Sequence, residues 1–215
     1  MGTRACIARK TPQGFQGRYH HWDGYPTGLG KALFTLYEGH FRRDLEAMLK
    51  TLVDDHPAGW STICDKDFGI EPGFEERTPC VLCGKEYSYN HDQENGHEFR
   101  LSNRPRCYCH GDRREGPWEV NQKNAAGSGC EWAYVFERVN GKDIMHILSS
   151  YCSSRGIKGQ KMIGCFGYGD RSAVWVEIFA VDLDAQEAPD WAAIADSAKE
   201  GRSGAPQRRL KRGVA

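Results

Sequence analysis

Residues 15–37, FQGRYHHWDGYPTGLGKALFTLY, pass from a strand pattern to a helix pattern through one short turn. Residues 15–22 form the strand candidate, which ends where Asp23-Gly24-Tyr25-Pro26 supplies turn residues. Thr27 is a suitable N-cap for the helix that follows, because its hydroxyl can accept a hydrogen bond from the first helical turn. The apolar residues of that helix recur at helical spacing and predict one buried stripe: Leu29, Ala32, Leu33, Leu36 and Tyr37.

The neighbouring segments extend this pattern on both sides. Residues 4–9 form another strand candidate, and turn residues at 11–14 predict that it pairs with residues 15–22 as a hairpin. A second helical stripe follows Gly39-His40, and Pro57 ends it. Its apolar members are Phe41, Leu45, Met48, Leu49, Leu52 and Val53.

Strand patterns return in the last third of the chain. Residues 131–139 alternate, Asn140-Gly141 is a strong hairpin turn, and residues 143–151 form the returning strand. Residues 173–183 form a further long strand candidate, and Asp190 is placed to cap a short helix.

These elements predict an α+β fold. We expect a mostly antiparallel sheet of roughly four to six strands packed on the two N-terminal helices. Residues 1–60 and 130–198 would form this core domain. Residues 61–129 are rich in Gly, Pro, Asn and charge, so they predict an insertion that a zinc ion stabilises. Residues 199–215 are mostly basic and polar and predict a disordered tail.

Composition limits the classes of protein that this chain can represent. The 215 residues include 29 basic and 29 acidic ones, so net charge gives no global argument for a nucleic-acid or membrane partner. No apolar run is long enough to span a membrane, and the N-terminus lacks the apolar stretch of a signal peptide. We therefore expect a cytoplasmic protein, in which the nine cysteines favour metal binding over disulfides.

Four cysteines have the spacing of a zinc site. Cys80 and Cys83 form a Cys-x-x-Cys pair followed by glycine, which permits the tight turn beneath a tetrahedral ion. Cys107 and Cys109 form a second, less regular pair. Four thiolates predict a closed structural site rather than a catalytic one. His110 is the first alternative for one of these four ligands, and His91, His97 and Cys64 are further alternatives.

The turn after the second strand candidate gathers polar and aromatic side chains. His21, Trp22, Asp23 and Tyr25 lie within five residues, between a strand and a helix. Asp23 and His21 could form a carboxylate–imidazole pair. With Thr3 and Arg4 on the paired strand, these residues form the candidate binding site, and a small anionic ligand would suit it. The other interpretation is structural, with turn residues at Asp23-Gly24 and aromatics in the core.

The same residues carry two resemblances. Met1-Gly2-Thr3-Arg4, residues 21–26 and the helix start at 27–31 resemble a family of small proteins from bacteriophages and bacterial genomes, for which no activity is established. That resemblance implies an α+β domain and a phage or mobile-element setting. The start is also similar to choloylglycine-hydrolase-like N-terminal nucleophile enzymes, which begin Met-Cys-Thr-Arg. Gly2 stands where their nucleophilic cysteine would be, so that mechanism does not transfer as written.

A basic segment lies beside the predicted zinc ligands. Its arginines, interleaved with Phe99 and Tyr108, suit phosphate contact and base stacking, unless they pair with the acids at 75–98. These arginines are Arg100, Arg104, Arg106, Arg113 and Arg114.

Two classes of function follow from the predicted sites. The first is a binding protein that engages a protein or nucleic acid, and the second is a small-molecule or nucleotide-binding protein or hydrolase that uses the turn at 21–25.

The zinc hypothesis predicts a measurable metal content. Elemental analysis of the purified chain should find about one zinc ion per molecule, and Cys80→Ser should lower both this content and the thermal stability, because metal binding contributes folding free energy. A metal-free protein whose stability is unaffected by Cys80→Ser would refute the hypothesis.

Overall fold

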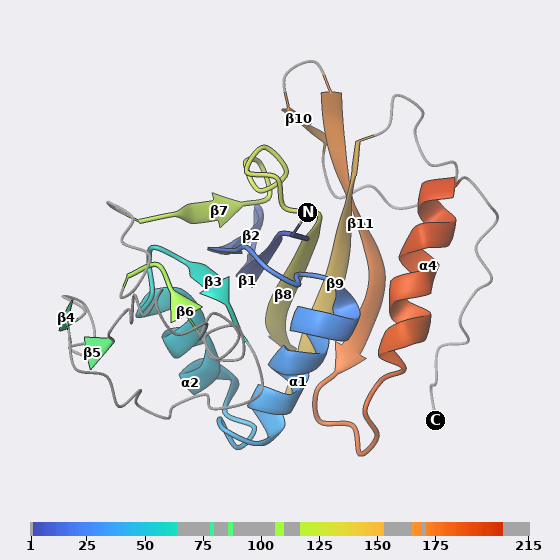
Figure 1. Cartoon of the computed structure of the whole chain (residues 1–215). Coiled ribbons are helices and arrows are strands. Elements are labelled where there is room, and N and C mark those ends of the chain that lie inside the picture. Colours follow the sequence, from blue (N-terminus) through green and yellow to red (C-terminus); the bar gives the residue numbers. More distant parts are fainter. Residues whose placement is uncertain are drawn as a thin grey trace, which may run out of the picture.

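The computed structural model describes residues 2–63, 78–79, 86–87, 106–109, 117–152, 165–168 and 171–203. Nine of its strands form one main sheet, and the helices pack against that sheet (Figure 1). The strands of this sheet are β1 (Ala5–Thr11), β2 (Gly14–His20), β3 (Trp60–Thr62), β6 (Arg106–Cys107), β7 (Glu119–Asn121), β8 (Trp132–Val139), β9 (Lys142–Cys152), β10 (Cys165–Tyr168) and β11 (Arg171–Asp182). A separate pair consists of β4 (Thr78–Pro79) and β5 (Glu86–Tyr87).

The described helices include four that follow the two predicted stripes and one that follows Asp190. They are η1 (Pro26–Gly30), α1 (Lys31–Glu38), α2 (Leu45–Leu49), η2 (Lys50–Asp54) and α4 (Trp191–Ser203). Every residue of both stripes is buried, and helices cover all of them except Phe41, because the second helical segment begins only at Leu45. The first one starts at Pro26 rather than after a Thr27 cap, because proline fits the first helical position, where no backbone donor is needed. Asp44 caps α2 and Asp190 caps α4 through their side chains.

The sheet is mixed, so the expectation of a mostly antiparallel sheet is wrong. Its order is β10-β11-β9-β8-β1-β2-β3-β6, with β7 pairing β2. The two predicted hairpins, β1–β2 and β8–β9, are confirmed. However, β1 also runs parallel to β8, with Ala5 opposite Trp132, and β2 runs parallel to β3. Residues 5–8 are fully buried, as expected of a central strand covered on both faces.

The two faces of the sheet bury separate cores. One face packs against α1, α2 and α4, with Leu33, Leu45 and Trp191 in a single cluster. The other face buries Tyr19 and Trp175 beneath residues of the 118–130 segment. Strands β3, β6 and β7 of the main sheet lie wholly or partly within the range predicted as an insertion.

The predicted zinc module is not part of the fold as described. Among the residues that the structure describes, no group of three or more His, Cys, Asp or Glu side chains is arranged to hold a metal ion. Cys107 is buried in the helical core, because a thiol also packs as a small apolar group. Cys109 Sγ accepts a hydrogen bond from the Ala58 amide at 3.4 Å. Cys80, Cys83 and His110 lie outside the described residues, so zinc binding itself stays a prediction.

Within the same described part of the chain, no helix is long and apolar enough to cross a membrane.

A histidine that lies between two glutamates joins three neighbouring strands. His146 in β9 contacts Glu137 in β8 through Nε2 at 2.8 Å and Glu177 in β11 through Nδ1 at 2.9 Å. Only a protonated imidazole donates from both nitrogens. The hydrogen bond to Glu177, with the charges of both glutamates, raises the pKa of His146 against the opposing effect of partial burial.

We predict that His146 makes stability depend on pH. A raised folded-state pKa means that the stabilisation is complete below the unfolded pKa of about 6.5 and is lost as pH rises through the folded value. The unfolding free energy of the natural chain, measured by urea denaturation, should therefore fall relative to that of His146→Gln as pH rises above about 6.5. His40→Gln, at an exposed histidine, is the control. Parallel curves for the natural chain and His146→Gln would contradict the charged clamp.

Candidate functional site

Backbone hydrogen bonds hold the turn at residues 21–25 on two sides. The amides of His21 and Trp22 donate to the carbonyls of Trp60 and Ser61, each at 3.1 Å, which continues the pairing toward β3. The Gly24 amide donates to the Thr3 carbonyl at 2.8 Å, just before β1. The turn is thus fixed to strands on both sides before any side chain is considered.

Gly24 lies in a space where the side chain of any other residue would displace neighbouring atoms. A Cβ there would stand 2.8 Å from both the Ala5 Cβ and the Thr3 carbonyl oxygen. The buried Tyr134 hydroxyl of β8 donates to the Gly24 carbonyl at 2.8 Å. Asp23 has a left-handed backbone with φ of 55°, and its carbonyl accepts from the Leu29 amide at 2.9 Å. These contacts give the turn one shape.

Two aromatic side chains of this turn face solvent. Trp22 is 46% exposed and Tyr25 is 38% exposed, and Val139 is the third exposed large hydrophobic residue in the described part of the chain. Gly2 packs directly against the six-membered ring of Trp22. The His21 ring meets the indole nearly edge-on, with centroids 4.5 Å apart and an interplanar angle of 68°. Contacts within the protein therefore position the indole, and the rest of its surface is open to a ligand.

Behind Trp22 the aromatic contacts continue into the sheet. The Tyr19 hydroxyl lies 2.9 Å from His21 Nδ1, and the Tyr19 ring stacks on Trp118 at 3.8 Å with an interplanar angle of 9°. Burial raises the pKa of Tyr19 to about 12, while the charge of the nearby Arg4 guanidinium acts in the opposite direction. We call Trp22, His21, Tyr19 and Trp118 the aromatic row.

Arg4 supplies a cation beside Tyr19 in this row. Its side chain is exposed and lies along Gly129, where an added Cβ would stand 3.3 Å from both Arg4 Cδ and Nη1. Among the described residues, no carboxylate forms an ion pair with Arg4, whereas Arg9 pairs with Glu46 and Asp54 and Arg138 pairs with Asp143. The Arg4 guanidinium can therefore bind an external anion without first breaking an ion pair with those residues.

The predicted site residues come together only in part. Thr3, Arg4, His21 and Trp22 lie around the same end of β1 and β2. Asp23 does not orient His21 through the contacts described: its Oδ1 accepts from the Tyr25 hydroxyl at 3.3 Å, while His21 Nδ1 contacts Tyr19. Of the predicted arginines, Arg104 and Arg113 lie outside the described residues, and Arg106 is described only as part of β6.

Tyr19 and Trp118 were not predicted as members of the site. Tyr19 in β2 precedes His21 by two residues, and His21 continues the pairing of the strand, so side-chain alternation places both on one face and could have found Tyr19. Trp118 reaches Tyr19 from a distant segment, and no sequence pattern indicates that contact.

His20, next to His21, has a structural role. It is fully buried, and its Nε2 accepts from the Ile63 amide at 3.0 Å, so a neutral ring carries its proton on Nδ1. Burial, with a smaller contribution from His21, lowers the pKa of His20 to about 3. The ring therefore stays neutral at physiological pH.

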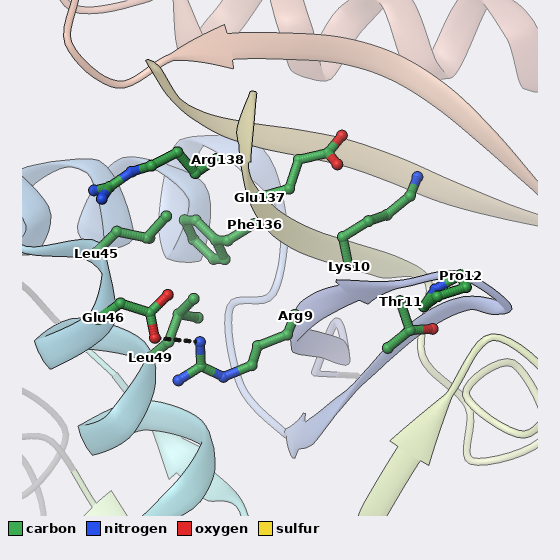
Figure 2. Close-up of a pocket in the computed structure, with 10 residues that line it drawn as sticks. All are labelled: Arg9, Lys10, Thr11, Pro12, Leu45, Glu46, Leu49, Phe136, Glu137 and Arg138. Carbon is green, nitrogen blue, oxygen red and sulfur yellow. Dashed lines mark hydrogen bonds and ion pairs between the residues drawn. The ribbon is translucent and has the colours of Figure 1, made fainter. Parts of the chain in front are cut away.

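A pocket lies at the opposite end of β1, away from the turn (Figure 2). Its volume is about 580 Å³, and none of the predicted binding residues lines it. Arg9 at its edge is paired with Glu46 at 2.8 Å, and Arg138 with Asp143 at 2.6 Å. Figure 2 shows apolar Leu45, Leu49 and Phe136 between these charged groups; the other lining residues are Lys10, Thr11, Pro12 and Glu137.

Comparison with known proteins gives no relative: no family model, no curated protein and no solved structure matches the chain. The resemblances seen in the N-terminal motifs therefore stay predictions.

Two tyrosines of the site should differ in their effect on stability. Tyr134→Phe leaves the buried Gly24 carbonyl without its donor and should cost about 1–3 kcal/mol of unfolding free energy. Tyr25→Phe removes an exposed, 3.3 Å hydrogen bond and should change it by less than about 0.5 kcal/mol. Urea denaturation of both variants measures the difference, and equal losses would show that the Tyr134–Gly24 bond does not fix the turn.

Proposed function

We propose that this chain is a binding protein that recognises a macromolecule through Trp22, its neighbours in the turn and Arg4. The single observation that supports this most is the indole of Trp22, which is exposed and yet packed against Gly2 and His21. Trp, Tyr and Arg are the residue types that dominate binding energy at macromolecular interfaces. A ring that is already fixed loses little conformational entropy when a partner covers it.

The arrangement favours binding over hydrolysis. A hydrolase at this turn would need His21 oriented as a base, and the carboxylate expected to orient it, Asp23, accepts from Tyr25 instead. The turn also lies apart from the pocket at the other end of β1. Catalysis and small-ligand binding at residues 21–25 stay predictions without this kind of geometric support.

Further parts of the proposal rest on the sequence alone. We place the protein in the cytoplasm and in a phage or mobile-element setting, where the partner would be a host or defence component. A zinc ion bound by Cys80, Cys83, Cys107 and Cys109, with the arginines at 100–114 as an added basic surface, belongs to the same proposal.

Complex formation in extracts of the producing cells tests the binding function. The full chain should elute from size exclusion at a larger size than the purified protein, and the double variant Trp22→Ala, Tyr25→Ala should lose at least about 90% of that complex, because hot-spot truncations cost about 2 kcal/mol or more. The variant must first show unchanged thermal unfolding.

Val139→Ala is the matched control, since it truncates another exposed hydrophobic side chain, at the end of β8 opposite to the Trp132 end that pairs with Ala5. It should keep the complex. A natural chain that elutes at its purified size, or a double variant that retains the complex, would rule out recognition through this turn.

A further inference from the structure

Resting on the proposed function, we propose that the macromolecule is a single-stranded nucleic acid, with a base stacked on Trp22 and a phosphate bound by Arg4. The inference combines one open aromatic ring with one exposed guanidinium at the same end of the sheet.

Trp22 has the features of a base-stacking platform. Gly2 covers part of the indole, and the edge-on His21 ring limits its rotation, yet nearly half of the side chain remains exposed. Bases stack on such rings without regard to sequence, because every base has a π face. A side chain at position 2 would displace the indole, so the glycine there is needed for this placement.

Arg4 provides the complementary phosphate contact. Tyr19 connects the two groups: its hydroxyl lies 2.9 Å from the His21 ring that contacts Trp22, and the Arg4 charge acts on the same hydroxyl. A guanidinium fork binds phosphate through two parallel hydrogen bonds. Because Arg4 has no carboxylate partner among the described residues, a phosphate need not compete with one of them for the guanidinium.

A single strand fits this surface better than a duplex. Bases in a duplex are covered by their stacked neighbours, whereas unpaired bases can turn outward onto an aromatic side chain. The chain has zero formal net charge, so its overall charge does not attract duplex phosphates. Affinity should therefore come mainly from stacking and from few phosphate contacts.

Fluorescence anisotropy of labelled oligonucleotides of about 12 nucleotides, DNA and RNA, tests the inference with the full chain. The natural protein should bind single strands, and unlabelled duplex should not compete. Trp22→Ala should weaken binding by about 5- to 150-fold, while Trp22→Phe, which keeps a ring, should restore most of it. Val139→Ala should bind like the natural chain.

Salt dependence separates the role of Arg4 from that of Trp22. The slope of log K against log salt changes by about 0.7 for each phosphate contact to a single strand. Arg4→Gln should reduce the slope by about that amount, whereas Trp22→Ala should leave the slope unchanged although affinity falls.

The outcomes distinguish the two proposals. One outcome is an extract complex that depends on Trp22, resists nuclease and is lost when the partner is treated with protease, while no oligonucleotide binds. In that case the partner is a protein and the inference is overturned. If oligonucleotides bind equally to the natural chain, Trp22→Ala and Arg4→Gln, the nucleic-acid site lies elsewhere and the inference is also overturned. If neither extract complex nor oligonucleotide binding is found, both proposals fail.

Discussion

The hydrogen bond from the Tyr134 hydroxyl to the Gly24 carbonyl connects the buried centre of the sheet to its exposed turn. It is possible because β8 runs parallel beside β1 and because Gly24 has no side chain to separate the turn from Ala5. Thr3, just before β1, then bonds to Gly24, and residues of β3 bond to His21 and Trp22. A turn supported from three strands keeps its aromatic side chains in place, although they lie at the surface.

Consecutive residues here have opposite roles, as strand geometry requires. His20 points into the protein, where burial keeps it neutral, and His21 points toward Tyr19 and Trp22. The exposed Trp22 indole thus has packed residues around it: Gly2 lies against the indole, and Tyr19 stacks on Trp118 behind it. A partner that covers Trp22 meets a surface that is already ordered, which lowers the entropic cost of binding.

Local patterns in the sequence predicted the local structure. Both helical stripes and both hairpins are confirmed, because helical spacing and turn residues such as Asn140-Gly141 act over few residues. The parallel pairing of β1 with β8 has no such signal, since Ala5 and Trp132 lie far apart in the chain. The expected pair of His21 and Asp23 likewise depended on side-chain directions that the left-handed backbone of Asp23 determines. Cysteine spacing indicated metal ligands, and the packing of Cys107 shows that a thiol can serve the core as well.

The indole resonances of the six tryptophans provide the most direct test of the account. In a two-dimensional NMR titration with a single-stranded oligonucleotide, the Trp22 Nε1–H signal should shift through the ring current of a stacked base, while buried Trp60 and Trp175 should keep their positions. A titration that reaches saturation with the Trp22 signal unmoved would contradict recognition by this ring.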